Sequence, residues 1–302
     1  MRRVVFAILP LLLLAGCGGG GDESGGTSFQ QQFRDAKSTS DPQSRAVRLV
    51  QLAYQQHNAG TVEGVRESLA AAGEAARQIE GADAKAETLA TVAYAAGAVG
   101  WLSEASELVK DVRGAIEDVE NQEVAAAATA KMAAVYGVHL DNARAAEVYI
   151  AQAEEIAGNI EDPESRARAL VAIAGRRFEL KQPEEAARLT EEASDLARSL
   201  EDPRRRADLL AEVADRYHKI GRSEQALSTF DEATAAAESI PDNYVSQSYA
   251  LLNIASKLHA AGYKEQARAA LAKTEQAADQ ILDQGQKGPF MTKLHQLRDR
   301  IL

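Results

Sequence analysis

Apolar and polar positions along the chain recur with a period of about 40 residues. The phrase Ile-Glu-Asp-Pro-Glu-Ser-Arg-Ala begins at Ile160, and Leu-Glu-Asp-Pro-Arg-Arg-Arg-Ala begins 40 residues later at Leu200. Weaker copies of the phrase begin at five further positions, namely Thr39, Ile79, Val119, Ile240 and Ile281. A fixed period of this size is typical of stacked supersecondary units. The pattern therefore predicts a repeat architecture of about six units.

Each unit contains two stretches in which apolar residues recur at helical spacing. In the unit from Ile160, Asp162 and Pro163 are the residue types that favour a helix N-cap and a first helical position. We expect this first helix to end near residues 181–183 and the second to run from about 184 to 200. Neither helix can bury its apolar stripe alone, so neighbouring units must stack.

Equivalent positions in the six units carry similar residues. A small residue stands late in each first helix, at Ala53, Ala93, Ala133, Ala174, Ala214 and Ala255. Seven positions later, four units carry a glycine, at Gly60, Gly100, Gly221 and Gly262. Glycine suits the left-handed residue that often follows a helix. In the third and fourth units we expect Leu140 and Lys181 to take its place.

This grid resembles the tetratricopeptide repeat. In the fourth unit, for example, Leu170 stands four positions before Ala174, and Ala186 stands twelve positions after it. The resemblance covers about residues 39–280 and implies an all-α, right-handed solenoid of helix-turn-helix repeats. The period departs from the family's 34 residues, since it is 40 or 41 here. The family's proline closing the second helix is also missing, which indicates longer helices and longer turns between units.

The two ends of the solenoid, predicted over residues 39–302, differ from its middle. We expect residues 285–289 to break the chain and residues 289–302 to form one amphipathic capping helix, which a solenoid needs at its end. Residues 29–38 fit either an added N-terminal turn or the end of a flexible tether.

The N-terminus has the features of a targeting segment. Arg2 and Arg3 precede an apolar stretch over residues 4–14, which is too short to span a bilayer. Residues 14–17, Leu-Ala-Gly-Cys, resemble a bacterial lipobox, and Cys17 is the chain's single cysteine. The resemblance implies a signal peptide over residues 1–16, a diacylglycerol and acyl anchor on Cys17, and a Gly/Ser-rich tether over 17–38. The alternative is a plain secretory signal with a chance cysteine.

The same resemblance predicts a location in the cell envelope. Gly18 follows Cys17 instead of the aspartate that retains lipoproteins in the inner membrane of enteric bacteria. We therefore expect the outer membrane, facing the periplasm, in a host that has one.

Charge and motif content narrow the function classes. The net charge is -11, and loss of Arg2 and Arg3 gives -11 - 2 = -13 for the processed chain, which argues against nucleic acid as a partner. The sequence contains no Gly-rich phosphate loop, paired metal motif or Gly-x-Ser-x-Gly elbow. We therefore predict no enzyme, no catalytic residue, no metal and no cofactor beyond the lipid.

The candidate ligand-binding residues follow from the family resemblance, which implies that certain columns face a concave groove. One column carries His57, Phe178, His218 and His259, and another carries Tyr54 and Tyr94. A third carries Arg168 and Tyr249. We predict that these residues contact a partner.

Alternatives remain for several of these residues. The histidines could instead hold a metal ion or sense pH, and the tyrosines could pack between repeats. Arg168 and Arg206 could clamp a carboxylate or lie on solvated helix faces.

These features favour a membrane-anchored scaffold that binds a peptide or partner protein in its groove. The alternative is an architectural or self-associating envelope lipoprotein without a dedicated peptide ligand. An enzyme with a site between repeats is a third possibility, which the missing catalytic motifs disfavour.

Overall fold

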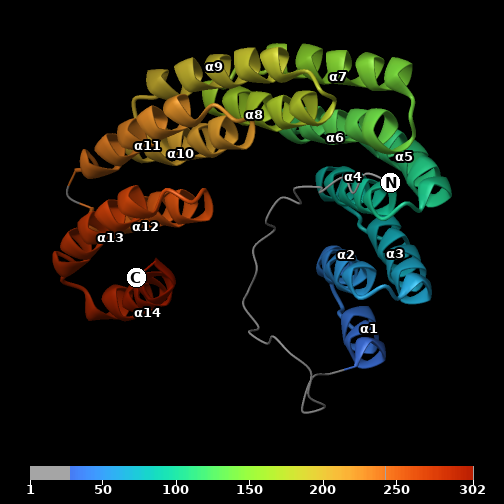
Figure 1. Cartoon of the computed structure of the whole chain (residues 1–302), viewed down its shortest axis with the longest axis horizontal. Coiled ribbons are helices and arrows are strands. Elements are labelled where there is room, and N and C mark those ends of the chain that lie inside the picture. Colours follow the sequence, from blue (N-terminus) through green and yellow to red (C-terminus); the bar gives the residue numbers. More distant parts are fainter. Residues whose placement is uncertain (1–27, 242, 302) are drawn as a thin grey trace, which may run out of the picture.

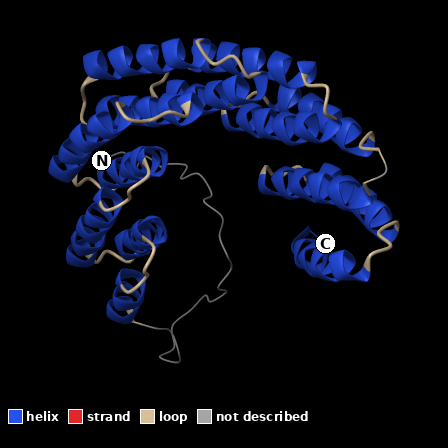
Figure 2. Ribbon diagram, turned by 180° about the vertical axis from the view of Figure 1, so that it is seen from behind, coloured by secondary structure: helices blue, strands red, loops and turns tan. Residues whose placement is uncertain are grey.

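The computed structural model describes residues 28–241 and 243–301, which form an arc of helices (Figure 1). The residues described contain helices and loops and no strand (Figure 2). Six helix pairs follow one another along the arc. They are α2 (Pro42–Asn58) with α3 (Val62–Arg77), α4 (Ala82–Ala98) with α5 (Leu102–Ile116), α6 (Gln122–Ala134) with α7 (Ala143–Gly158), α8 (Pro163–Glu179) with α9 (Pro183–Ser199), α10 (Pro203–Lys219) with α11 (Ser223–Glu238), and α12 (Tyr244–Ala260) with α13 (Lys264–Asp279). The predicted all-α solenoid of six helix-turn-helix units is confirmed.

The even-numbered helices α2 to α12 lie along the inside of the arc, and the odd-numbered helices α3 to α13 lie along the outside (Figure 1). Every helix of one pair packs against its partner and against the next pair in the series. Stacking buries the apolar stripes of both helices, and the inner helices of successive units together form one continuous inner face.

Aspartate side chains begin three of the inner helices, as the sequence predicts. The Asp41 carboxylate accepts a hydrogen bond from the backbone N–H of Ser44 at 2.8 Å. Asp162 accepts one from the backbone N–H of Ser165 at the same distance. Asp202 accepts hydrogen bonds from two backbone N–H groups in the first turn of α10, the helix that it begins. These bonds lower the pKa of each aspartate and fix where the helix starts.

Left-handed residues end most of the inner helices. The four glycines predicted for this position, namely Gly60, Gly100, Gly221 and Gly262, have φ between 76° and 83°. Lys181 takes the same conformation with φ 65°, although it has a side chain. In the third unit Asp141 has φ 50°, so the expectation for Leu140 is wrong by one residue.

A π-helical turn, η1 (Val135–His139), causes that displacement. The Leu140 N–H donates to the Val135 carbonyl at 3.0 Å, which is an i→i−5 bond and takes up one more residue than an α-helical turn. This turn therefore accounts for the extra residue between the third and fourth units.

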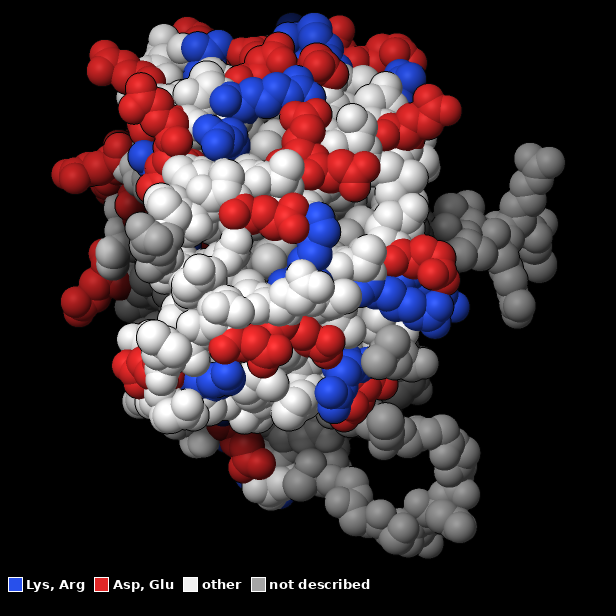
Figure 3. Space-filling view, turned by 90° about the vertical axis from the view of Figure 1, so that its left-hand side faces the viewer, with Lys and Arg blue, Asp and Glu red and all other residues white. Residues whose placement is uncertain are grey.

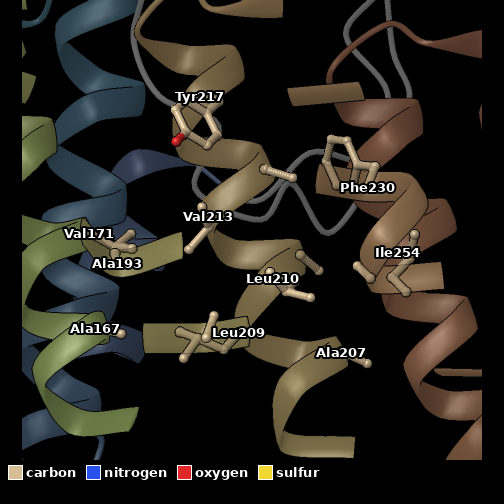
Figure 4. Close-up of a cluster of buried hydrophobic side chains, with 14 of the residues drawn as sticks. Ala167, Val171, Ala193, Ala207, Leu209, Leu210, Val213, Tyr217, Phe230 and Ile254 are labelled. Carbon is tan, nitrogen blue, oxygen red and sulfur yellow. The ribbon is translucent and has the colours of Figure 1, made fainter. Parts of the chain in front are cut away.

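The buried apolar residues form two clusters that meet at α6. The first extends from Ala36 to Val135 and the second from Ala126 to Ile301. Alanines supply much of both, so helix backbones approach closely. Part of the second cluster, around Leu209, Leu210 and Phe230, is shown in Figure 4. Full burial of a leucine or phenylalanine contributes about 1.5–3 kcal/mol.

The N-terminal end differs from the prediction. Residues 29–37 form α1 (Phe29–Lys37), which packs on α2 and buries Ala36. The predicted tether therefore cannot extend to residue 38, because Phe33 and Ala36 share one apolar face that has a helix to pack against. Cys17, the signal peptide and residues 17–27 of the tether lie outside the described residues.

The C-terminal helix also begins earlier than predicted. Helix α14 (Gln284–Ile301) includes Pro289, so the expected break over residues 285–289 is wrong. Proline removes the hydrogen bond to the Gly285 carbonyl, but Gly285 is exposed and water can replace the lost donor. Phe290, Leu294 and Leu297 are buried against the last pair and close the end of the core. No helix among the described residues combines the length and apolarity needed to cross a bilayer.

Candidate ligand site on the inner face

Charged and aromatic side chains from five consecutive inner helices, and from the π turn that follows α6, gather on the inside of the arc. We call them the inner-face cluster, and its members are Tyr54 on α2, Tyr94 on α4, Lys131 on α6, His139 on η1, Arg176 and Glu179 on α8, and Arg216 on α10. All seven side chains are partly buried. They share this surface because successive inner helices present successive units to the same side.

Tyr94 and Arg176 form the middle of the inner-face cluster. The Arg176 guanidinium carbon lies 5.0 Å from the centre of the Tyr94 ring, as in a cation–π contact. The Tyr94 hydroxyl donates to Glu179 Oε2 at 3.1 Å, and Arg176 Nη1 donates to the same oxygen at 2.8 Å. Burial and the Glu179 charge raise the pKa of Tyr94 to about 12. The tyrosine hydroxyl is therefore a fixed, neutral donor.

Tyr54 lies within the same electrostatic environment. Burial raises its pKa, while the Arg176 charge lowers it and the Glu179 charge raises it. Tyr54 and Tyr94 also pack against the N-terminal apolar cluster. The two tyrosines thus pack between repeats and also face the charged cluster, and their contact with a partner stays a prediction.

Lys131 is a cation without a carboxylate partner. Its Nζ donates to Thr91 Oγ1 at 2.8 Å, and it forms no ion pair within the described chain. Burial, followed by repulsion from Arg176, lowers the pKa of Lys131 to about 8. The charged form is therefore less stable here than in water.

Arg216 has even fewer partners. Its side chain forms no hydrogen bond or ion pair with any described residue, and its Nε is buried. Burial and the Arg176 charge lower its pKa to about 10, with partial compensation from Asp215 and Glu179. Its guanidinium lies directly over Gly175, where a Cβ atom would overlap Nη1. Glycine at this position leaves the space that the guanidinium occupies.

His139 completes the inner-face cluster at the π turn. Its ring meets the edge of Tyr94 with centres 5.0 Å apart, and its Nε2 is buried without a partner. Burial and the Arg176 charge lower the pKa of His139, so the ring is neutral near pH 7. Gly97 makes room for it, because a Cβ there would lie 2.6 Å from His139 Cδ2.

These features give the inner face an unsatisfied positive charge. Arg176 has Glu179, but Lys131 and Arg216 have no ion-pair partner among the described residues. A buried cation without a partner is costly, and a charge-assisted hydrogen bond to an anion removes that cost. The cluster can therefore attract and orient an anionic group.

Arg168 and Arg206, by contrast, are already satisfied by the chain itself. Arg168 forms an ion pair with Glu164 at 2.5 Å and a longer one with Glu212 at 3.8 Å. Arg206 donates to the Leu200 carbonyl at 2.7 Å. The chain itself thus supplies acceptors to both arginines, which favours the interpretation as solvated helix faces over the carboxylate clamp, and the contact of Arg168 with a partner stays a prediction.

The histidine column does not converge on one point. His218 Nδ1 lies 3.2 Å from the Tyr263 hydroxyl of the next unit. His57 is exposed and His259 partly buried, and neither imidazole ring forms a hydrogen bond within the described residues. Among those residues no group of three or more His, Cys, Asp or Glu side chains is arranged to hold a metal ion. Phe178, in the same column, is 38% exposed.

Tyr249 is packed under the capping helix. Its ring meets the fully buried Phe290 edge-on at 5.0 Å, and Lys293 Nζ lies 5.1 Å from its centre. Because α14 packs against α12 at this end, Tyr249 is partly covered by the chain itself, and its contact with a partner stays a prediction.

Sequence reasoning identified the two tyrosines of the inner-face cluster but missed its cations. Arg176 and Arg216 stand 40 residues apart, each two positions after the small alanine of its unit. Basic residues at equivalent positions of neighbouring inner helices were the signal available. Lys131 and His139 follow no such column, and His139 depends on the π turn.

No protein-family model and no curated protein sequence matches the chain. Among solved structures, the chain is similar to the TPR-like repeats of a kinesin light chain from Podosopora anserina, with 19% sequence identity and a TM-score of 0.39. The match covers 66% of this chain and 97% of that chain. The chain is also similar to BtubC from P. vanneervenii, with 16% identity, coverages of 83% and 91%, and a TM-score of 0.38. A Rap protein solved with Competence and Sporulation Factor gives 14% identity, coverages of 89% and 79%, and a TM-score of 0.36.

Proposed function

We propose that this protein is a membrane-anchored scaffold of the bacterial cell envelope that binds a peptide or partner protein on its inner face. The supporting observation is the inner-face cluster, where Lys131 and Arg216 lack an ion-pair partner beside two tyrosines. Tyrosine and arginine are the residues that contribute most often to protein–protein binding energy. The contact would be made by side chains from five consecutive inner helices and the π turn after α6, which suits an extended or helical partner segment.

The membrane part of the proposal rests on the sequence at Cys17. Two acyl chains meet what stable membrane attachment needs, and a third on the new N-terminus exceeds it. Changing Cys17→Ser should move the protein from the membrane fraction to the soluble fraction of its host. Retention of that variant in the membrane fraction would remove this part of the proposal.

The binding part is tested by cross-linking and co-purification of the full-length lipoprotein from its native host. A Tyr54→Ala/Tyr94→Ala double variant should lose the captured partner. Because both tyrosines also pack on the core, a Tyr54→Phe/Tyr94→Phe variant keeps the packing and removes only the hydroxyls, and circular dichroism checks the fold of each. Tyr244→Ala is the matched control, since Tyr244 is 44% exposed and lies on α12 outside the cluster.

A single envelope protein lost from the alanine variant but kept with Tyr244→Ala supports the scaffold. Recovery of only the protein itself, equally from all variants, contradicts it and favours self-association. Sedimentation of the lipid-free domain at micromolar concentration then decides whether the chain associates with itself.

A further inference from the structure

The charges around the inner-face cluster do not balance. Lys131, Arg176 and Arg216 contribute three positive charges, and Glu179 contributes one negative charge, which leaves a net charge of +2. Two other carboxylates lie nearby. Asp215 is engaged by Lys219 at 2.5 Å, so this pair is neutral. Glu87 acts on Lys131 only at a distance and is exposed, so water screens its charge.

The geometry leaves donors free to meet that missing charge. The Arg216 side chain makes no hydrogen bond with a described residue, and its position depends on a glycine that leaves space for the guanidinium. His139 Nε2 is buried, unpaired, and able to donate in the tautomer that carries its proton there. These donors come from η1 and α10, and the Lys131 ammonium comes from α6. They therefore approach the inner face from different helices.

A carboxylate is planar and carries one charge, and one arginine is enough to satisfy it in a bidentate pair. A phosphate monoester carries a charge of about −1.5 to −2 at pH 7 and three acceptor oxygens in a tetrahedral arrangement. The charge and geometry of the phosphate monoester match the inner-face cluster, which has a net charge of +2 and donors from several helices.

We propose that Lys131, Arg176 and Arg216 form a binding site for a phosphoryl group carried by the protein partner. This inference rests on the proposed function, since the phosphoryl group belongs to the protein held on the inner face. It adds the chemical class that the partner must present. Arg176 keeps its contact with Glu179 and Tyr94 and orients the site, while Lys131 and Arg216 supply the unpaired charge.

The first test uses inorganic phosphate as the probe on the lipid-free domain. Lysine side-chain NMR follows Lys131, assigned by its loss in Lys131→Met, during phosphate titration at constant ionic strength. We expect a saturable shift and a Lys131 pKa that rises as phosphate binds. Arg216→Met should weaken phosphate binding about tenfold or more, as expected for lost charge-assisted hydrogen bonds. Because Arg216 has no partner in the chain, this variant should keep its helical signal.

Arg222→Met is the matched control, since Arg222 is 39% exposed and pairs with Glu184. Acetate at equal concentration is the monoanion control. Equal saturation by acetate overturns the preference for a phosphoryl group. An absent or non-saturable shift, or an effect equal in Arg216→Met and Arg222→Met, overturns the site.

The second test separates this inference from the proposed function. Arg216→Met and phosphatase treatment of the extract should each abolish partner capture from the native host. If both leave capture intact while Tyr54→Ala/Tyr94→Ala abolishes it, the scaffold stands and the phosphoryl site fails. If phosphatase has no effect but extraction of lipids abolishes capture, the group belongs to a lipid and the assignment to a protein partner is wrong.

Discussion

The repeats before and after the π turn are held together differently. Within the described residues before it, the ion pairs are those of Arg77 with Glu104 and Asp111 and of Lys110 with Glu107. After it, ion pairs connect helices throughout the series. Examples are Arg177 with Glu147 and Glu154, Arg198 with Glu232, and Lys273 with Glu238. Figure 3, which views the left side of Figure 1, shows acidic and basic side chains intermixed.

The comparison distinguishes charged side chains that hold helices together through ion pairs from charged side chains that are left without a partner and can bind a ligand. In the N-terminal half, alanine-rich helices pack closely and few charges are needed. In the C-terminal half many arginines, such as Arg177 and Arg198, have a carboxylate from a neighbouring helix, whereas Arg216 has no ion-pair partner among the described residues and its Nε is buried. Whether a charged side chain stabilises the fold or is free to bind a ligand therefore depends on its ion-pair partners. Residue type alone does not distinguish Arg216 from Arg177.

The largest effect should follow from removing the most buried of the paired arginines. Arg177 is 6% exposed and donates to Glu154 at 2.6 Å and to Gln182 at 2.6 Å. Arg177→Met should lower the free energy of unfolding by about 3 kcal/mol, because several charge-assisted hydrogen bonds are lost at once. Urea unfolding measures this. Arg222→Met, at an exposed pair, should cost less than about 1 kcal/mol, and equal losses would contradict the comparison.

Removing an unpaired cation should raise the free energy of unfolding, whereas removing Arg177 lowers it. Lys131→Met should stabilise the fold at pH 7 by on the order of 2 kcal/mol, since the lysine pKa is lowered to about 8 from an ordinary 10.5. Between these values the unfolded chain keeps the proton and the folded chain releases it. The wild-type free energy of unfolding should therefore rise with pH across this window.

The gain from Lys131→Met should correspondingly shrink towards pH 10. Urea midpoints at pH 7 and pH 9.5 for both proteins check this pH dependence. A gain that stays constant with pH would show that Lys131 is not destabilised by its surroundings.

Substitution of two glycines in the N-terminal half tests how much close packing contributes to stability there. Gly97→Ala should cost about 1–3 kcal/mol, because its Cβ would overlap the partly buried His139 ring. Gly114→Ala should instead gain about 0.5–1 kcal/mol, because it lies in helix α5 with open space around it. Thermal or chemical unfolding of both variants is sufficient, and a shared sign would refute the distinction.

The smallest effect concerns the turns after the inner helices. Lys181→Gly should stabilise the fourth unit by about 1 kcal/mol, because Lys181 has φ 65° and glycine adopts that conformation without strain. Gly221→Ala in the fifth unit, with φ 81°, should destabilise by about the same amount. Differential scanning calorimetry of the two variants gives the signs, and a loss for Lys181→Gly would mean that its side chain stabilises the turn.

Part of the inner-face cluster was accessible from the sequence. Tyr54 and Tyr94 followed from the repeat columns, because equivalent residues of stacked units face the same side. Arg168 and Tyr249 followed from the same reasoning, but repeat columns do not show that Arg168 pairs with Glu164 or that Tyr249 packs against Phe290.

The sequence by itself determined the helix pairs, their period, the aspartate caps and five of the six left-handed turns, the exception being Asp141 in place of Leu140. These features depend on contacts between residues a few positions apart, which a linear pattern contains. Tertiary structure alone decided the π turn, the packing of α1 and α14, and the meeting of Tyr94 with Glu179, 85 residues away. It also decided which cations remain unpaired, because pairing depends on distances between helices that no local pattern specifies.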